Sequence, residues 1–246
     1  MAQCVLEDLR IQVEASPSRT ARIAREALLL GSLLAVYLGV RYLALRHSTA
    51  AFSNAELVVG LENGLRLPSE ANLQHDALPV PHLAQAANGY YALVHFPLTV
   101  SVLLWLSVRH RAVYPRVRWA MVSVTALATV GHLVFPLAPP RMLPGFIDTG
   151  VRYGQSVYGP TTDSGVANQF AAMPSLHVGW ATMIAIVLVL VARSRWRWLW
   201  LLHPVLTFAV VVLTANHYWL DGLVALALVG LCLPILIRPR PRTAVW

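Results

Sequence analysis

The chain has 246 residues, of which 57% are hydrophobic and only 12% are charged. Soluble domains usually carry about 25% charged residues, so this composition excludes an ordinary soluble enzyme. The formal net charge of +8 at pH 7 does not indicate a nucleic-acid partner, because the basic residues are not interleaved with aromatic residues as a nucleic-acid platform requires. We therefore expect an all-α, polytopic membrane protein.

Six apolar segments come close to the ~20 residues that a helix needs to cross the hydrocarbon core of a membrane. In chain order they are Ala27–Leu45, Ala92–Val108, Trp119–Ala138, Leu176–Ala192, Leu199–Ala215 and Leu220–Ile237. No small-residue cleavage site follows the first segment, which favours a retained anchor over a signal peptide. The predicted organisation is one membrane domain, residues 27–237, between two tails, residues 1–26 and 238–246.

The arginine residues predict the orientation of these segments. The chain contains no lysine, and 14 of its 19 arginines fall in the two tails and in the second and fourth connections. Cytoplasmic loops are enriched in arginine and lysine. We therefore predict a multi-pass plasma-membrane protein with both termini in the cytoplasm and the first, third and fifth connections on the extracytoplasmic side.

Two of the predicted outer connections are long, residues 46–91 and 139–174. Within the first, the stretch Ala55–Leu67 places Leu57, Leu61 and Leu65 at helical spacing, which is typical of an amphipathic helix at the membrane interface. The second is rich in glycine and proline. Loops of this length in a compact protein are usually functional or disordered.

This topology brings four polar residues, far apart in the sequence, to the same membrane level. Arg141 follows the third segment, His177 begins the fourth, and His217 and Asp221 lie where the chain passes from the fifth to the sixth. His217 and Asp221 are four residues apart and share a helix face. The carboxylate can then fix the imidazole tautomer and leave the other ring nitrogen as a base or nucleophile.

The start of the fourth segment has the features of an anion site. Pro174 suits the first turn of a helix, where free N–H groups and the helix dipole attract an anion, and Ser175 adds a hydroxyl group or only caps the helix. A phosphate held there could be protonated on its leaving oxygen by His177 while His217 attacks phosphorus. The guanidinium of Arg141 matches the geometry of the non-bridging oxygens.

Three further residues are candidates for binding the substrate. Asn216 precedes His217, and Tyr91 and His95 share a helix face near the outer end of the second segment. Tyr91 and His95 could line a head-group pocket or form a polar cluster between helices. Both interpretations stay open at this point.

The motifs Ala172–Gly179 and Asn216–Asp221 resemble those of the type 2 phosphatidic acid phosphatase superfamily, over roughly Asn88 to Gly222. The branch resembled is that of the bacterial inositol phosphorylceramide synthase-like proteins. The resemblance implies a six-helix membrane core and a site at the outer face that needs no metal or other cofactor. It also implies His177 as general acid, His217 as the phosphate-accepting nucleophile and Asp221 as the residue that orients it.

The chain departs from the superfamily pattern in its cationic residues. It has no lysine for the first motif, and Val210 and Val211 stand where a serine–arginine pair is usual. Arg141 therefore carries most of the predicted phosphate binding, and Arg152 is a candidate for a second charge. Leu176, where many phosphatases have glycine, favours the synthase-like branch.

The predicted function is phosphoryl transfer on a lipid-linked phosphate, with membrane lipids and an alcohol acceptor as partners. Water as acceptor would make the protein a phosphatase, and an alcohol would make it a transferase; the motifs do not separate the two, and transfer of a head group such as inositol phosphate is slightly favoured. Two alternatives remain open. One is a metal-dependent enzyme using two histidines and a carboxylate, and the other is a transporter.

Overall fold

The computed structural model describes residues 48–157 and 169–237, together with isolated positions between 24 and 39. The chain divides into two compact units, residues 1–40 and 41–246, and all the named helices belong to the second. The predicted tails, residues 1–26 and 238–246, and most of the predicted first span, Ala27–Leu45, lie outside the described residues.

The described part of the second unit is helical, which confirms the predicted all-α class. Its helices are α3 (Ser48–Gly64), α4 (Glu70–Ala77), α5 (Leu83–Gly89), α6 (His95–Arg109), α7 (Tyr114–Val134), α8 (Thr149–Arg152), α9 (Leu176–Val191), α10 (Leu202–Leu213) and α11 (Trp219–Ile237). A π-helical turn, Tyr90–Val94, joins α5 to α6, and 3-10 turns occupy Pro140–Met142 and Arg195–Leu201.

Four stretches of helix in the described residues are long and apolar enough to cross a membrane. They are Leu83–Arg109, Tyr114–Val134, Arg195–Leu213 and Trp219–Ile237. The helix α9 is strongly apolar but has only 16 residues, and it begins directly after its N-cap residue Ser175. These helices agree with the prediction of a membrane protein.

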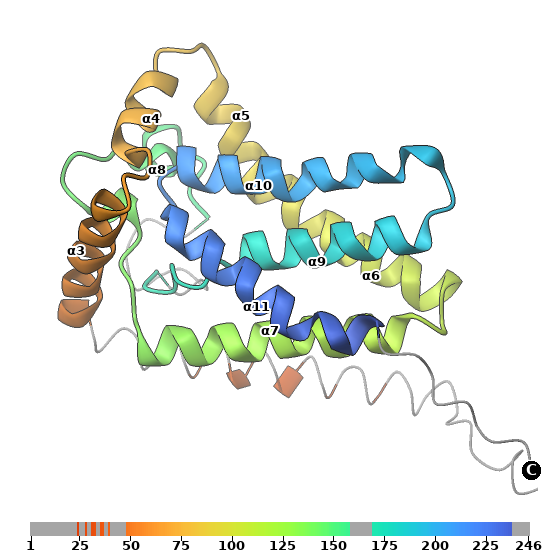
Figure 1. Ribbon diagram of the computed structural model, residues 1–246. Coiled ribbons are helices and arrows are strands. Elements are labelled where there is room, and N and C mark those ends of the chain that lie inside the picture. Colours follow the sequence, from red (N-terminus) through yellow and green to blue (C-terminus); the bar gives the residue numbers. More distant parts are fainter. Residues whose placement is uncertain are drawn as a thin grey trace, which may run out of the picture. The chain divides into compact units, whose positions relative to one another are not determined.

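The membrane helices pack side by side, with α3, α4 and α8 at one end of the bundle (Figure 1). The helix α9 contacts α6, α7, α10 and α11, and α11 also packs along α7. Buried aliphatic side chains from four of the helices fill the space between them, among them Leu106, Val124, Ile184 and Val229. Many large apolar side chains on the outer surfaces stay exposed, as expected of surfaces that face lipid.

The helix α3 begins seven residues before the predicted start at Ala55 and ends at Gly64. Its small residues Ala51, Ala55 and Val58 pack on Leu137 and Phe170 of the loops beneath it. The three leucines that suggested an amphipathic helix, Leu57, Leu61 and Leu65, are all about 60% exposed. One face of α3 therefore packs against the rest of the protein, and a separate apolar face is exposed.

The prolines of the first outer connection lie at helix boundaries. Pro68 precedes α4, whose first turn is capped by the side chain of Ser69. The buried side chain of Gln74 in α4 bonds the backbone N–H and C=O of Ile147, at 2.8 and 2.9 Å. These bonds hold α4 against the loop that leads to α8, so the two long connections, both predicted to be outer, lie together at one end of the bundle (Figure 1).

Candidate active site

His217 lies in the short loop between α10 and α11, and its ring is held by two acceptors. Its Nδ1 atom is 2.8 Å from the carbonyl oxygen of Ala172 and 3.2 Å from Oδ2 of Asp221. A carbonyl oxygen can only accept, so the proton of the neutral ring must be on Nδ1. The Nε2 atom then carries the lone pair, and it faces Nδ1 of His177 at 3.4 Å.

The turn before His217 has a strained backbone. Ala215 adopts a φ of +55°, a left-handed conformation that costs roughly 1–2 kcal/mol for a residue with a side chain. Its carbonyl oxygen accepts a hydrogen bond from the backbone N–H of Arg141 at 2.8 Å. The backbone N–H groups of Asn216 and His217 both donate to the carbonyl of Val211. The strained turn thus ends α10 and fixes the backbone that carries His217.

Asp221 occupies the first turn of α11 and is fully buried. Its Oδ2 atom accepts from the backbone N–H of Tyr218 at 2.9 Å as well as from His217. Its carbonyl oxygen accepts from the backbone N–H of Ser175 at 3.0 Å. Asp221 therefore orients the His217 ring and also ties the beginning of α9 to the beginning of α11.

The beginning of α9 is fixed from three sides. The side chain of Ser175 accepts from the backbone N–H of Val178 at 3.4 Å, so in this structure the hydroxyl caps the helix. The ring of His132 in α7 bonds the carbonyl oxygen of Pro174 at 3.0 Å. Gly131, one residue earlier, lets Pro174 approach so closely that a Cβ atom there would be 2.8 Å from the proline ring. The backbone that presents His177 is held in place as a result.

The rings of Tyr91 and His95 both lie against His177. Tyr91 stacks on it with the ring centroids 4.4 Å apart, and the centroid of His95 is 5.1 Å from it. His95 also stacks on His203 of α10 at 5.8 Å. Tyr91 and His95 therefore both contact His177, and His95 also joins it to His203; whether the pair binds a head group stays a prediction.

Arg141 is buried, and its guanidinium contacts Asn216 and Asp148 among the described residues. One terminal nitrogen donates to Oδ1 of Asn216 at 2.8 Å, and Nε lies 3.4 Å from a carboxylate oxygen of Asp148. Asp148 was not distinguished by any sequence spacing, because it lies in an irregular loop. Arg152 is exposed, with its guanidinium 5.7 Å from the centre of the Tyr153 ring.

The charge on His217 follows from its burial. The pKa of His217 is lowered from 6.5 to about 3, mainly by burial and in smaller part by the positive charge of Arg141, while the bond to Ala172 acts in the opposite direction. The imidazole is therefore neutral at physiological pH, which keeps the Nε2 lone pair available for attack on an electrophile.

Two buried glutamates, one in α3 and one in α4, contact the start of α11, and no sequence pattern marks them. Oε1 of Glu62 accepts from the backbone N–H of Leu220 at 2.8 Å, and Oε1 of Glu70 accepts from that of Trp219 at 3.3 Å. The pKa of Glu62 is raised to about 9, mainly by burial and in smaller part by the neighbouring Glu70. A heptad or helix-face pattern cannot reveal this contact, because it joins segments about 150 residues apart.

The described residues do not contain three or more His, Cys, Asp or Glu side chains grouped as metal ligands. Arg141 is close enough to His217 for its charge to affect the pKa of the imidazole, and it bonds Asn216, the residue before His217. Asp221 is bonded to the Nδ1 side of the same ring. The arrangement offers a nucleophilic nitrogen, a second titratable ring and a cation in one place.

A family model of the PAP2 superfamily matches residues 56–235, most of the chain and all of the site. The chain belongs to this superfamily, which confirms the resemblance to the type 2 phosphatidic acid phosphatases and indicates a phosphatase-type enzyme. The synthase-like branch stays a prediction. No curated protein and no solved structure matches the chain significantly.

The protonated carboxyl of Glu62 predicts a pH dependence of stability. Between pH 4.5 and about 9 the folded protein keeps a proton that the unfolded chain has released, so the free energy of unfolding falls as the pH rises through this range. Glu62→Gln keeps an acceptor for Leu220 and imitates the protonated form. We expect its melting temperature in detergent to fall less between pH 6 and pH 9 than that of the unsubstituted protein.

The matched control is Glu56→Gln, an exposed glutamate of the same helix, which should follow the unsubstituted protein. Equal slopes of melting temperature against pH in all three proteins would contradict the assignment of a proton to Glu62.

Proposed function

We propose that the protein transfers or hydrolyses a lipid-linked phosphate at the extracytoplasmic membrane face, without a metal and through a phosphohistidine at His217, with head-group transfer favoured over hydrolysis. One observation carries the proposal. The Nδ1 proton of His217 is committed to Ala172 and Asp221, so its Nε2 lone pair is directed toward His177. Membership of the PAP2 superfamily supports phosphoryl chemistry at this pair.

The proposed reaction has two steps. In the first, Nε2 of His217 attacks phosphorus, the bond from phosphorus to the leaving oxygen breaks, and His177 gives that oxygen a proton. In the second, an acceptor hydroxyl attacks the phosphohistidine, returns a proton to His177 and releases His217. Water as acceptor yields hydrolysis, and an alcohol yields transfer.

Asp221 has the role of stabilising the charge that develops on His217. As Nε2 bonds to phosphorus, the ring becomes cationic, and the adjacent carboxylate compensates that charge in a region from which water is largely excluded. The Nδ1 proton stays in place throughout, because its two acceptors are fixed by α11 and by the loop before α9.

The phosphoryl group must enter from the side of Arg141. The 3.4 Å between the His217 and His177 nitrogens leaves no space for a phosphorus atom between the rings. Asn216 joins Arg141 to the backbone next to His217, so a phosphate that displaces this bond would contact the cation and the nucleophile together. His177 then turns toward the leaving oxygen.

The nucleophile can be tested with phosphatidic acid that carries ³²P in its phosphate. Brief incubation and an alkaline quench should leave an acid-labile label on the unsubstituted protein and none on His217→Ala. His177→Ala should label at least about 100-fold more slowly, the usual contribution of a general acid. Chase with water or with an alcohol identifies the acceptor.

His75→Ala, which removes an exposed histidine of α4, is the control and should label as the unsubstituted protein does. Product formation with no label on His217, or label that persists in His217→Ala, would contradict the phosphohistidine mechanism.

The extracytoplasmic position of the site is a proposal that rests on the arginine distribution. That distribution predicts cytoplasmic termini and an even number of spans, six in all. The position can be tested in a cysteine-free background with one introduced cysteine at a time, at Asn72 in α4 or at Arg111 between α6 and α7. Both residues are exposed. A membrane-impermeant thiol reagent should label Asn72→Cys in intact cells and Arg111→Cys only after permeabilisation. The reverse pattern would place the site on the cytoplasmic side.

A further inference from the structure

A ring stack that neither sequence motif contains lies directly against His177. The ring of Tyr91 has its centroid 4.4 Å from that of His177, and the two planes are 29° apart. Tyr91 is only 8% exposed and belongs to an apolar cluster with Val178 of α9 and Val211 of α10. One face of the His177 imidazole is therefore covered by an aromatic side chain that is itself packed in place.

The π-helical turn Tyr90–Val94 presents Tyr91 to His177. In this turn the backbone N–H of His95 bonds the carbonyl oxygen of Tyr90, five residues earlier. Such turns are rare and are frequent at functional sites. Here the turn directs two neighbouring side chains to different helices, because Tyr91 lies on His177 of α9 while Tyr90 reaches α10.

The hydroxyl of Tyr90 anchors the turn to α10. It lies 2.6 Å from Nδ1 of His203 and 3.1 Å from the hydroxyl of Thr207. The Thr207 hydroxyl also donates to the carbonyl oxygen of His203 at 2.8 Å. These bonds fix the residue directly before Tyr91 to a second helix.

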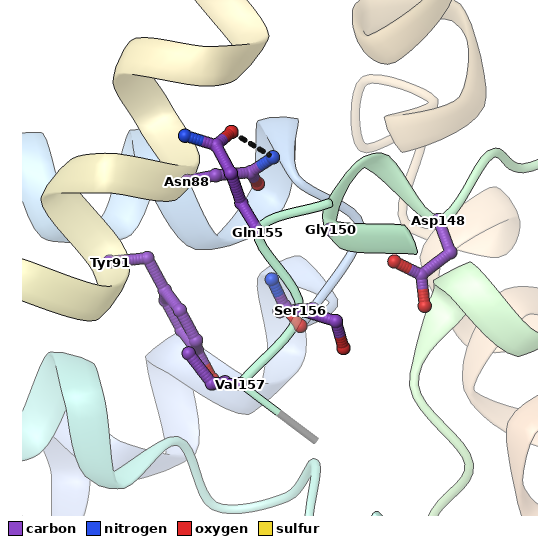
Figure 2. Close-up of a pocket in the computed structure, with 8 residues that line it drawn as sticks. Asn88, Tyr91, Asp148, Gly150, Gln155, Ser156 and Val157 are labelled. Atoms are coloured by element: carbon purple, nitrogen blue, oxygen red, sulfur yellow. Dashed lines mark hydrogen bonds between the residues drawn. The ribbon is translucent and has the colours of Figure 1, made fainter. Parts of the chain in front are cut away.

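The carboxamide of Asn88 anchors the same segment one turn earlier. It accepts from the hydroxyl of Thr149 at 2.9 Å and donates to the side chain of Gln155 at 3.3 Å. Figure 2 shows Asn88 and Tyr91 on one helical segment, with both side chains directed toward the loop that follows α8. Two parts of the fold therefore hold the backbone that carries Tyr91, as a preorganised site requires.

The stack favours one orientation and one charge state of His177. With its face against Tyr91, the imidazole presents its nitrogen-bearing edge to His217, whose Nε2 lies 3.4 Å from Nδ1 of His177. The face of a phenol ring attracts a cation within about 6 Å of its centre. Within the described part of the chain no carboxylate pairs with His177, and the other rings against it, His217 and His95, are basic. The aromatic face is therefore the neighbour that favours the imidazolium.

We propose that Tyr91 is a positioning residue for the general acid. Its ring holds the His177 imidazole edge-on to His217 and stabilises the imidazolium form, from which the leaving oxygen takes its proton. The catalytic consequence rests on the proposed phosphohistidine function, but the stack itself does not.

The stack can be tested without turnover by NMR of the full-length protein in detergent, with its histidines labelled with ¹³C. The carbon-bound ring protons of His177, assigned by their loss in His177→Gln, should be shifted upfield by the Tyr91 ring. Tyr91→Leu should remove this shift, and Tyr91→Phe should keep it because the stacked ring remains.

The role in proton transfer can be tested with two ³²P-labelled phosphate monoesters that carry the same alkyl chain, one of a nitrobenzyl alcohol and one of a nitrophenol. A nitrophenolate leaves readily without a proton, whereas the benzyl alkoxide needs one from the general acid. Tyr91→Leu should slow single-turnover labelling of His217 by the benzyl ester about tenfold and by the phenyl ester at most about twofold. His177→Ala should show the same selectivity with a larger effect, and Tyr91→Phe should restore the rate.

Phe96→Leu is the matched control. Phe96 lies in the same predicted membrane span, and its ring contacts Trp180 of α9 with the centroids 6.3 Å apart. This variant removes an aromatic contact between the same two helical segments without touching the histidines, so it should change neither the NMR shift nor the rate with either ester.

The outcomes separate this proposal from the proposed function. Absence of the upfield shift, equal slowing with both esters in Tyr91→Leu, a raised KM as its only effect, or an equal loss in Tyr91→Phe would overturn the positioning role. Loss of selectivity in His177→Ala, or a normal stack in a protein that forms no phosphohistidine, would contradict the proposed function and with it the catalytic consequence of the stack.

Discussion

The hydrogen bonds at Nδ1 of His217 are the constraint on which the rest of the site depends. A histidine side chain has several rotamers, and in the one observed here Nε2 of His217 faces His177. The carbonyl of Ala172 and the carboxylate of Asp221 select that rotamer and the tautomer together. Because Ala172 belongs to the loop before α9 and Asp221 to α11, the ring is oriented only when both segments are in place. The orientation of the proposed nucleophile therefore depends on the fold around His217 as well as on the histidine itself.

The buried carboxyl groups at the start of α11 show how helices α3 and α4 contact the site. Asp221, Glu62 and Glu70 approach the same helix start, each accepting from one of its first N–H groups. Three buried carboxylates so close together would repel one another, and the retained proton on Glu62 reduces that repulsion. Tyr218, whose hydroxyl donates to the carbonyl of Ala138, completes the connection to the loop that carries Arg141. Helices α3 and α4 thus support the catalytic helix directly.

The sequence predicted the parts of the site that follow from helical spacing and membrane topology. His217 and Asp221 are four residues apart and were expected on one helix face. The order of the apolar segments predicted that His177 lies at the same membrane level, and the structure brings all three residues together. The contact of Asp148 with Arg141 could not be predicted, because an irregular loop sets it. The contact of Glu62 with α11 could not be predicted either, because it joins two helices about 150 residues apart in the sequence. The first span and both tails lie outside the described residues, and the six-span topology stays a prediction.

The most direct test of the central claim is a structure of the protein with orthovanadate, which adopts the geometry of a phosphoryl group during transfer. The account predicts vanadium bonded to Nε2 of His217, with His177 turned toward the opposite oxygen and the bond from Arg141 to Asn216 replaced by a contact with vanadate. Vanadate bound away from Nε2 of His217, or bonded to His177 instead, would contradict the account.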